Sequence, residues 1–243
     1  MSAYALVISA HPDDAELACG GTIRALTNQG HDVVLLDCTR GELGTRGTPE
    51  LRMQEAQRAA DILGVRHREC LSMPDGAIEH TQENIRAIVT SIRAWRPHIV
   101  LIPPPVERHP DHVAVHKLCV AATFTAGLTK VITHRDGVEQ QPYRPKRTLC
   151  FQQQYDFPRL PDLYVDISAT FAAKMDSIRA YTSQFHAPGE YTSDEPETFI
   201  SRPAFLMELE ARARYYGSRI GTDYAEGFLA VEPIAVASLA DLL

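Results

Sequence analysis

The first hundred residues alternate between short apolar segments and longer amphipathic ones, and this alternation constrains the fold more than any other feature. A near-continuous apolar run predicts a buried strand at residues 4–10, and further strands are predicted at residues 32–39, 66–73 and 98–103. Helices are predicted between them at residues 22–29, 49–63 and 81–95. Strands that alternate with helices in this way build an open parallel sheet with right-handed crossovers. We therefore predict an α/β fold, with a Rossmann-like, mostly parallel sheet and helices on both faces.

Local signals support these boundaries and extend the sheet into the second half of the chain. Thr48 is a favoured N-cap residue, Pro49 a favoured first helical residue, and Gly64 a favoured residue after a helix. Further strands and helices are predicted at residues 148–154, 163–167, 171–185 and 204–216. No linker rich in proline, glycine or serine separates the two halves. We expect one domain over residues 1–243, in which the second half extends the same sheet and ends in a small C-terminal extension.

Composition excludes several classes of protein. With 44% hydrophobic and 23% charged residues, the chain resembles an ordinary globular protein, and its formal net charge of -7 argues against a nucleic-acid partner. No apolar run approaches the ~20 residues that span a bilayer, so we expect no membrane partner. The N-terminal Met-Ser-Ala-Tyr lacks an apolar signal region, and the five cysteines form no Cys-x-x-Cys pair. These features predict a cytoplasmic protein with reduced thiols.

The tripeptide His-Pro-Asp occurs twice, each time directly after a predicted buried strand. The first strand leads to His-Pro-Asp-Asp at residues 11–14, and the fourth leads to His-Pro-Asp-His at residues 109–112. Because ligands of an open parallel sheet bind beyond the carboxyl ends of its strands, we expect both segments at one site. A lone motif of this kind is usually a helix-capping turn. Its repetition at equivalent positions favours a shared function instead.

The side chains of these two segments suit a catalytic zinc ion. Such an ion takes three nitrogen or oxygen ligands and leaves a position open for water. Residues i and i+3 of a tight turn can point to the same place, so we predict His11 and Asp14 as ligands, with His112 as the third. His116 is an alternative ligand, because it follows His112 by four residues on a predicted helix. The same donors also suit Fe²⁺ or another divalent metal.

The neighbouring side chains could complete the hydrolysis of an amide. Zinc lowers the pKa of bound water to about 7, and a nearby carboxylate can then take the proton. Asp13 is not used as a ligand and is predicted to be this base. His109 could stabilise the oxyanion or protonate the leaving amine. Asp111 is predicted to orient His109 and to raise its pKa.

Two arginines near the motifs are candidate substrate ligands. Arg52 and Arg108 could hold a carboxylate or a hydroxyl-rich group through their planar guanidinium groups. A surface arginine is more often simply solvated, and only proximity to the motifs favours these two. The glycine-rich residues 40–47 lack the Lys-Ser/Thr of a phosphate-binding P-loop.

Taken together, the motifs resemble those of the PIG-L/LmbE-like deacetylases over nearly the whole chain. The matching segments are His-Pro-Asp-Asp at 11–14, Gly-Gly-Thr at 20–22, Thr-Arg-Gly-Glu-Leu-Gly-Thr at 39–45 and Arg-His-Pro-Asp-His at 108–112. Residues 52–64, 183–185 and 224–228 look most like the branch that deacetylates N-acetylglucosaminyl malate in bacillithiol biosynthesis.

The resemblance implies the same zinc ligands and the same catalytic residues as the assignment above. It further implies substrate contacts from Arg52 and Arg108, and from Tyr191 near the carbonyl oxygen. The implied substrate is a small amino sugar whose acetyl group is removed as acetate. Members of this branch are often hexamers, so the resemblance also implies a homo-oligomer.

Other functions are compatible with some of these features. A deacetylase of another N-acetylglucosamine derivative, such as a chitooligosaccharide, or an amidase of thiol S-conjugates would use the same metal site. A non-catalytic, nucleotide-binding Rossmann-like module is a more remote alternative. The sequence argues against that module, because His-Pro-Asp-Asp follows the first strand where a dinucleotide-binding chain has Gly-x-Gly-x-x-Gly.

Overall fold

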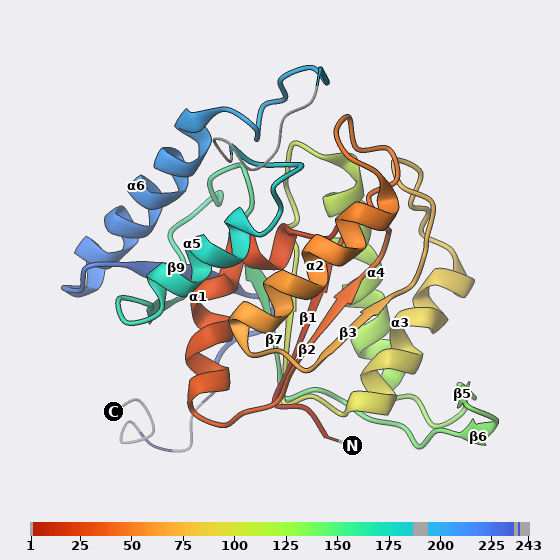
Figure 1. Ribbon diagram of the computed structural model, residues 1–243. Helices are drawn as coiled ribbons and strands as arrows, with labels where there is room; N and C mark the ends of the chain where they lie inside the picture. The colour runs from red at the N-terminus through yellow and green to blue at the C-terminus, as the bar shows by residue number, and fades with distance from the viewer. Residues whose placement is uncertain (1, 187–193, 236–237, 239–243) are drawn as a thin grey trace.

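A mixed sheet forms the centre of the protein (Figure 1). The computed structural model describes residues 2–186, 194–235 and 238. The strands in this part of the chain are β1 (Ala5–Ser9), β2 (Val33–Asp37), β3 (His67–Cys70), β4 (Ile99–Ile102), β5 (His134–Arg135), β6 (Val138–Glu139), β7 (Arg147–Phe151), β8 (Leu163–Asp166) and β9 (Ala225–Ala230). The helices there are α1 (Asp14–Asn28), α2 (Pro49–Leu63), α3 (Gln82–Trp95), α4 (Pro110–Ala126), α5 (Phe171–Arg179) and α6 (Pro203–Ile220).

The order of strands in the sheet is β3-β2-β1-β4-β7-β9-β8. The pairs from β3 to β7 are all parallel. Strand β9 then runs antiparallel between β7 and β8. Strands β5 and β6 form a separate antiparallel hairpin. The predicted Rossmann-like, mostly parallel α/β fold is confirmed.

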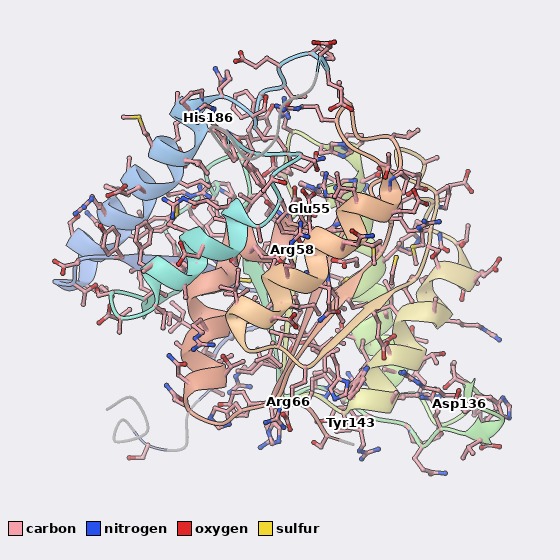
Figure 2. The ribbon with its side chains drawn as sticks, in the orientation of Figure 1. Glu55, Arg58, Arg66, Asp136, Tyr143 and His186 are labelled. Atoms are coloured by element: carbon pink, nitrogen blue, oxygen red, sulfur yellow. The ribbon has the colours of Figure 1, made fainter. Side chains whose placement is uncertain are left out.

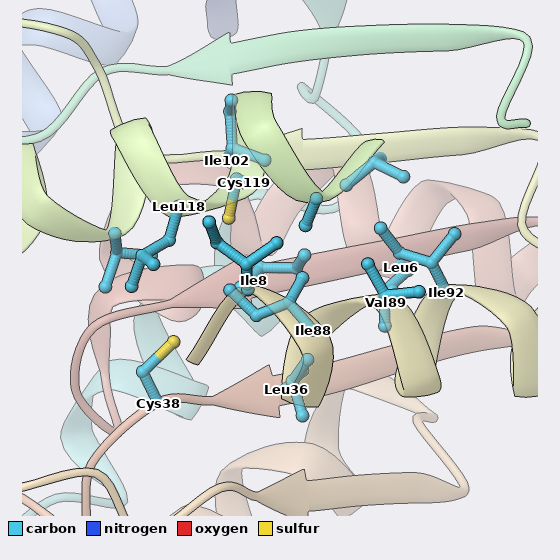
Figure 3. Packing of buried hydrophobic residues seen from close by; sticks show 14 of the residues in the cluster. Leu6, Ile8, Leu36, Cys38, Ile88, Val89, Ile92, Ile102, Leu118 and Cys119 are labelled. Atoms are coloured by element: carbon cyan, nitrogen blue, oxygen red, sulfur yellow. The ribbon is translucent and has the colours of Figure 1, made fainter. Parts of the chain in front are cut away.

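Helices cover both faces of the sheet because its strands are apolar on both sides. Leu6 and Ile8 of β1 pack against α3 and α4, in a cluster that includes Ile88 and Leu118 (Figure 3). The alternate residues Ala5 and Val7 belong to a second cluster with α1 and α2. Successive side chains of a strand point to opposite faces, so one five-residue strand supplies both cores.

The predicted helix at residues 49–63 matches α2 in both bounds, and its capping residues explain why. Thr48 accepts a hydrogen bond from the backbone of Leu51 at 3.2 Å, and Gly64 follows the helix with φ 75°. Residues 22–29 were predicted as part of a helix, and helix α1 contains most of them but begins earlier, at Asp14. The polar His-Pro-Asp-Asp segment therefore leads directly into the helix, with no intervening loop.

Strand β9 is a feature that hydrophobic patterning does not predict. Glu226 lies within it and is buried, yet a charged residue in a core strand is unusual. Its carboxylate accepts hydrogen bonds from the backbone of Gly21 at 3.1 Å and of Thr22 at 2.8 Å, and it pairs with Lys174. These contacts compensate its charge and tie β9 to α1 and α5.

The strand order creates a crevice between β1 and β4. The helix after β1 covers one face of the sheet, whereas the helix after β4 covers the other. The two connecting segments diverge at this point, which is where open α/β sheets bind ligands. Both His-Pro-Asp segments occupy it. Within the described residues, no helix has the length and apolar character required to cross a membrane.

Candidate active site

A strained turn presents the first motif. Asp13 has φ 108°, a conformation that residues other than glycine seldom adopt. Asp14 begins α1 directly after it, and the backbone N–H of His11 donates to Oδ2 of Asp14 at 2.9 Å. The strain is offset by Arg52, which donates to the carbonyl oxygen of Pro12 from Nε at 3.0 Å and from Nη2 at 2.7 Å. The turn is therefore held by contacts from outside its own strand and helix.

The structure brings the three predicted metal ligands together. The Asp14 carboxylate lies between the two imidazoles, with Oδ2 3.7 Å from Nδ1 of His11 and Oδ1 3.2 Å from Nε2 of His112. Burial alone would raise the pKa of Asp14, but the adjacent His112 and His11 rings hold it well below its usual range. An ionised carboxylate between two imidazoles is a donor set that zinc binds well.

A third imidazole adjoins this group. Ligand atoms of His11, His109 and His112 all lie within 4.8 Å of one another, so His109 is a further candidate metal ligand. Nδ1 of His112 is buried and has no hydrogen-bond partner in the described part of the chain. A buried polar atom without a partner indicates that an absent group completes the site. The residues present therefore fit a divalent metal.

His116, the alternative ligand, lies outside this group. Its Nδ1 is 2.9 Å from the carbonyl oxygen of Pro103 and 3.8 Å from Sγ of Cys150. Among the described residues, two groups of side chains could hold a metal ion, and His116 belongs to neither: one is His11, His109 and His112, and the other is His11, Asp75 and Asp111. The helical spacing from His112 does align the two side chains, but only His112 reaches the crevice.

Asp75 is a site residue that the motifs did not reveal. It follows β3 at the same edge of the sheet, and its Oδ1 lies 3.0 Å from Nε2 of His11. Its Oδ2 accepts a hydrogen bond from the backbone of Leu43 at 2.8 Å. Topology offered a signal, because every loop after a parallel strand reaches this edge. Because the Asp75 carboxylate contacts Nε2 of His11, the other ring nitrogen, Nδ1, is left facing Asp14.

The contacts of the Asp111 carboxylate differ from its predicted role of orienting His109. Its carboxylate contacts His11, with Oδ2 3.3 Å from Nε2, and accepts the backbone N–H of Gly76 at 2.8 Å. The His109 ring instead receives the backbone N–H of Asp111 on Nδ1 at 3.2 Å. The prediction that this carboxylate orients His109 is therefore wrong for this structure, because a two-residue spacing at the start of α4 turns it toward His11.

The environment of His109 also differs from the prediction. Its pKa is lowered, first by burial and then by the neighbouring His11 and His112 rings; Asp111 opposes this shift, as expected, but does not outweigh it. The rings of His11 and His109 pack edge to face, with centroids 4.7 Å apart. The adjacent imidazoles disfavour a positive charge on His109, whereas, against the effect of burial, the carboxylates of Asp111, Asp14 and Asp75 raise the pKa of His11.

Asp13, the predicted base, is buried beside Arg52. It is 4% exposed, and Nη2 of Arg52 donates to its Oδ2 at 2.6 Å. Burial raises the pKa of Asp13 to about 7, and the Arg52 guanidinium opposes that rise. A carboxyl group with a pKa near neutrality can both accept and return a proton.

The predicted substrate-binding residues differ in how buried they are and in what they contact. Arg52 is buried and directs Nε at Pro12 and Nη2 at Pro12 and Asp13, and it also lines two cavities at the site. Arg108 is exposed, with its guanidinium 5.0 Å from the ring centroid of Phe199. Tyr191 lies outside the described residues.

Buried charges beneath the site fix its supporting elements. Arg68 of β3 donates to Asp37 at 2.6 Å and to Glu16 of α1 at 2.6 Å. The hydroxyl of Tyr181 donates to the same Glu16 carboxylate at 3.0 Å. On α2, Glu55 accepts the backbone N–H of Ser183 at 2.8 Å and its hydroxyl at 2.6 Å (Figure 2). These contacts join both halves of the chain behind the crevice.

A small cavity of about 160 Å³ opens over the site. Charged or polar side chains line one side, among them His11, Asp13 and His112. Leu17 and Phe205 line another side and make it apolar. The cavity is smaller than the ≈ 300–1,000 Å³ of a typical ligand pocket, so it suits a short group such as an acetamide.

Comparisons with known proteins agree with this geometry. A family model described as PIG-L, GlcNAc-PI de-N-acetylase, matches residues 6–123. The chain is 36% identical over 234 residues to the diacetylchitobiose deacetylase of Thermococcus kodakarensis, covering 91% of this chain and 80% of that protein. It is 28% identical to a probable N-acetyl-α-D-glucosaminyl L-malate deacetylase of Bacillus cereus, covering 79% and 88%.

A solved structure extends the agreement to the fold. The crystal structure of a conserved protein of Thermus thermophilus superposes with a TM-score of 0.85 at 34% identity, covering 98% of both chains. The predicted family resemblance is confirmed by these matches. Both the sequence motifs and the relatives lead to one assignment: the chain belongs to the PIG-L family.

Proposed function

We propose that the protein is a metal-dependent N-deacetylase that hydrolyses the acetamido group of an N-acetylglucosamine derivative. The observation that supports it best is the cluster at the β1–β4 crevice, where Asp14 lies between His11 and His112 and Asp13 stands beside them. The relatives named above are deacetylases of such sugars. The simplest test is release of acetate from N-acetylglucosamine glycosides by the purified protein.

In this proposal His11, Asp14 and His112 hold the metal, with His109 close enough to join them. Zinc bound there would polarise the amide carbonyl and acidify the attacking water. Asp13 accepts the proton of that water, while Arg52 fixes the carboxylate and the turn that carries it. His109 lines the same cavity, which supports its proposed role in returning a proton to the leaving amine.

The substrate proposal is narrower than the family assignment. The sequence motifs favour N-acetylglucosaminyl L-malate, whose deacetylation gives glucosaminyl malate and acetate. The identity to the diacetylchitobiose deacetylase, 36% against 28% for the malate deacetylase, favours a chitooligosaccharide instead. We propose the N-acetylglucosaminyl group as the shared element and treat the aglycone as the variable to be measured.

A panel of substrates separates these choices. N-acetylglucosaminyl malate, diacetylchitobiose, free N-acetylglucosamine and a thiol S-conjugate would be compared by kcat/KM for acetate or acid release. A preference for the malate glycoside supports the bacillithiol branch, and a preference for diacetylchitobiose supports the alternative. Equal rates on all glycosides would contradict a specific aglycone. The predicted homo-oligomer is tested separately, by the molar mass of the protein in solution.

A further inference from the structure

Arg212 of α6 is a partly buried guanidinium that lacks a carboxylate partner. It donates from Nη1 to the carbonyl oxygen of Gln153, and none of its nitrogens forms an ion pair within the described ranges. A guanidinium carries five N–H donors, so most of its hydrogen-bonding capacity is unused. Burial lowers the pKa of Arg212, and the nearby Tyr216, Asp156, Glu226 and Glu107 oppose that shift only in part.

In the described part of the chain, other arginines with buried side chains have more acceptors than Arg212. Arg52 pairs with Asp13, and Arg68 pairs with both Asp37 and Glu16. Arg93 has no carboxylate, but it donates to three carbonyl oxygens and a hydroxyl. A desolvated cation left with one acceptor is costly, so such an arginine is expected to have an external partner.

A second donor without an acceptor lies beside it. Nε2 of Gln153 is buried and has no hydrogen-bond partner among the described residues, and the side chain as a whole is 6% exposed. Gln153 and Arg212 both line the small cavity over the candidate metal ligands. Two neighbouring donors that lack acceptors fit an anionic ligand with two oxygens.

Arg212 also connects that cavity to a larger one. A cavity of about 540 Å³ lies between α6 and the segment that joins β7 to β8, and Arg212 and Phe205 line both. A third cavity of about 300 Å³ adjoins the site from the side of the glycine-rich loop, through His11 and Arg108. The larger and third cavities share none of their described lining residues, so the site opens in two directions.

We propose that Arg212 and Gln153 form a carboxylate-binding site on the α6 side of the active site. This inference rests on the proposed function, because it assigns the second opening to a carboxylate of that reaction. Hydrolysis of the acetamide breaks its C–N bond, with water supplying the oxygen of acetate and a proton for the amine. Acetate formed over the metal ligands would then meet Arg212 in the same cavity.

The carboxylate has two sources that share this chemistry. One is the acetate product, leaving through the larger cavity while the sugar occupies the third. The other is a carboxylate on the aglycone of the substrate, as in a malate glycoside. Both use the same donors, but the first predicts altered product inhibition and the second predicts altered recognition of anionic substrates.

The direct test measures acetate binding to metal-free protein by NMR titration, so that neither a metal nor activity is needed. The wild type is expected to bind acetate but not acetamide, and Arg212→Met is expected to weaken acetate binding about tenfold or more. Arg214→Met is the matched control, because Arg214 lies on the same helix but is exposed and paired with Glu210 at 2.8 Å. It is expected to bind acetate like the wild type.

A second variant tests the inference even if Arg212→Met does not fold. Gln153→Glu keeps Arg212 and supplies the missing carboxylate internally, so it is expected to abolish acetate binding while the thermal unfolding midpoint is maintained or raised. In the active enzyme, Arg212→Met should weaken inhibition by acetate if the ligand is the product. It should instead raise KM for the malate glycoside, but not for diacetylchitobiose, if the ligand is the aglycone.

Two outcomes would overturn the inference. The first is metal-free wild-type protein that does not bind acetate. The second is acetate binding, acetate inhibition and the KM for the malate glycoside that are all unchanged in Arg212→Met. Inactivity of the enzyme with intact acetate binding would contradict the proposed deacetylation but not the carboxylate site.

Discussion

Oδ1 of Asp75 lies 3.0 Å from Nε2 of His11, on the side of the ring opposite to the nitrogen that faces Asp14. Metal-ligating histidines usually donate their second ring N–H to a carboxylate, which fixes the tautomer and the orientation of the ring. Asp75 and Asp111 both occupy that position. The pKa of Asp75 is lowered to about 2: burial opposes the shift, and it is outweighed by the hydrogen bonds with His11 and the backbone of Leu43 together with the charges of His11 and His109.

Asp75→Asn should therefore weaken metal binding without removing a ligand. The amide keeps the shape of the side chain but loses the charge that stabilises the Nε2–H of His11, so we expect a 10–100-fold loss of zinc affinity. Competition with a chromophoric chelator measures it. Asp136→Asn is a matched control, because Asp136 lies in the exposed β5–β6 turn far from the crevice (Figure 2). Equal affinities in both variants would exclude a role for Asp75.

Asp13→Asn should reduce turnover while preserving the fold and the metal. Asparagine tolerates positive φ better than most residues, so the strained turn is expected to survive. Loss of the base should lower kcat by about 10²–10⁴-fold. The zinc content, measured by mass spectrometry, should stay at the wild-type value. A variant with near wild-type kcat would require another residue to be the base.

Replacement of the two histidines of α4 distinguishes the ligand from its alternative. His112→Ala should lose the metal, because it removes an imidazole from the cluster that contains Asp14. His116→Ala should retain it, since His116 contacts Pro103 and Cys150 instead. The measurement is metal stoichiometry after dialysis. Metal loss in His116→Ala, with retention in His112→Ala, would reverse the assignment.

Arg68→Met should destabilise the protein through the carboxylates it leaves behind. Asp37 and Glu16 are both fully buried, and removal of one partner of a buried pair typically costs about 3–5 kcal/mol. Urea denaturation gives the free energy of unfolding. Arg66→Met is the control, because the side chain of Arg66 is 81% exposed and should contribute about 0–1 kcal/mol (Figure 2). A loss below 1 kcal/mol for Arg68→Met would contradict this account.

The parallel core of the fold could be predicted because strong local signals agree with the tertiary structure there. Thr48, Pro49 and Gly64 mark both ends of α2, and the apolar runs of β1 and β4 are buried on both faces. Strand β9 could not, because its buried Glu226 is stabilised by Gly21, Thr22 and Lys174, which are distant in the sequence. A hydrophobic pattern indicates which residues are buried, but it does not indicate which residues distant in the sequence contact each other.

The same distinction between local signals and long-range contacts applies to the candidate site. The proximity of His11, Asp14 and His112 could be predicted because these residues belong to two similar segments that each follow a strand. The contacts of Asp75 and Arg212 could not, since neither residue lies in a motif and each acts through the topology. The carboxylate of Asp111 was assigned to the wrong ring for a related reason, because its direction depends on the first turn of α4.

The most direct test of the central claim is acetate release from an N-acetylglucosamine glycoside by chelator-treated protein, before and after zinc is restored. We predict no release without metal, recovery on addition of one equivalent of zinc, and no recovery in His112→Ala. Activity that survives complete removal of metal, or equal recovery in His112→Ala, would contradict a metal-dependent deacetylase built on these three ligands.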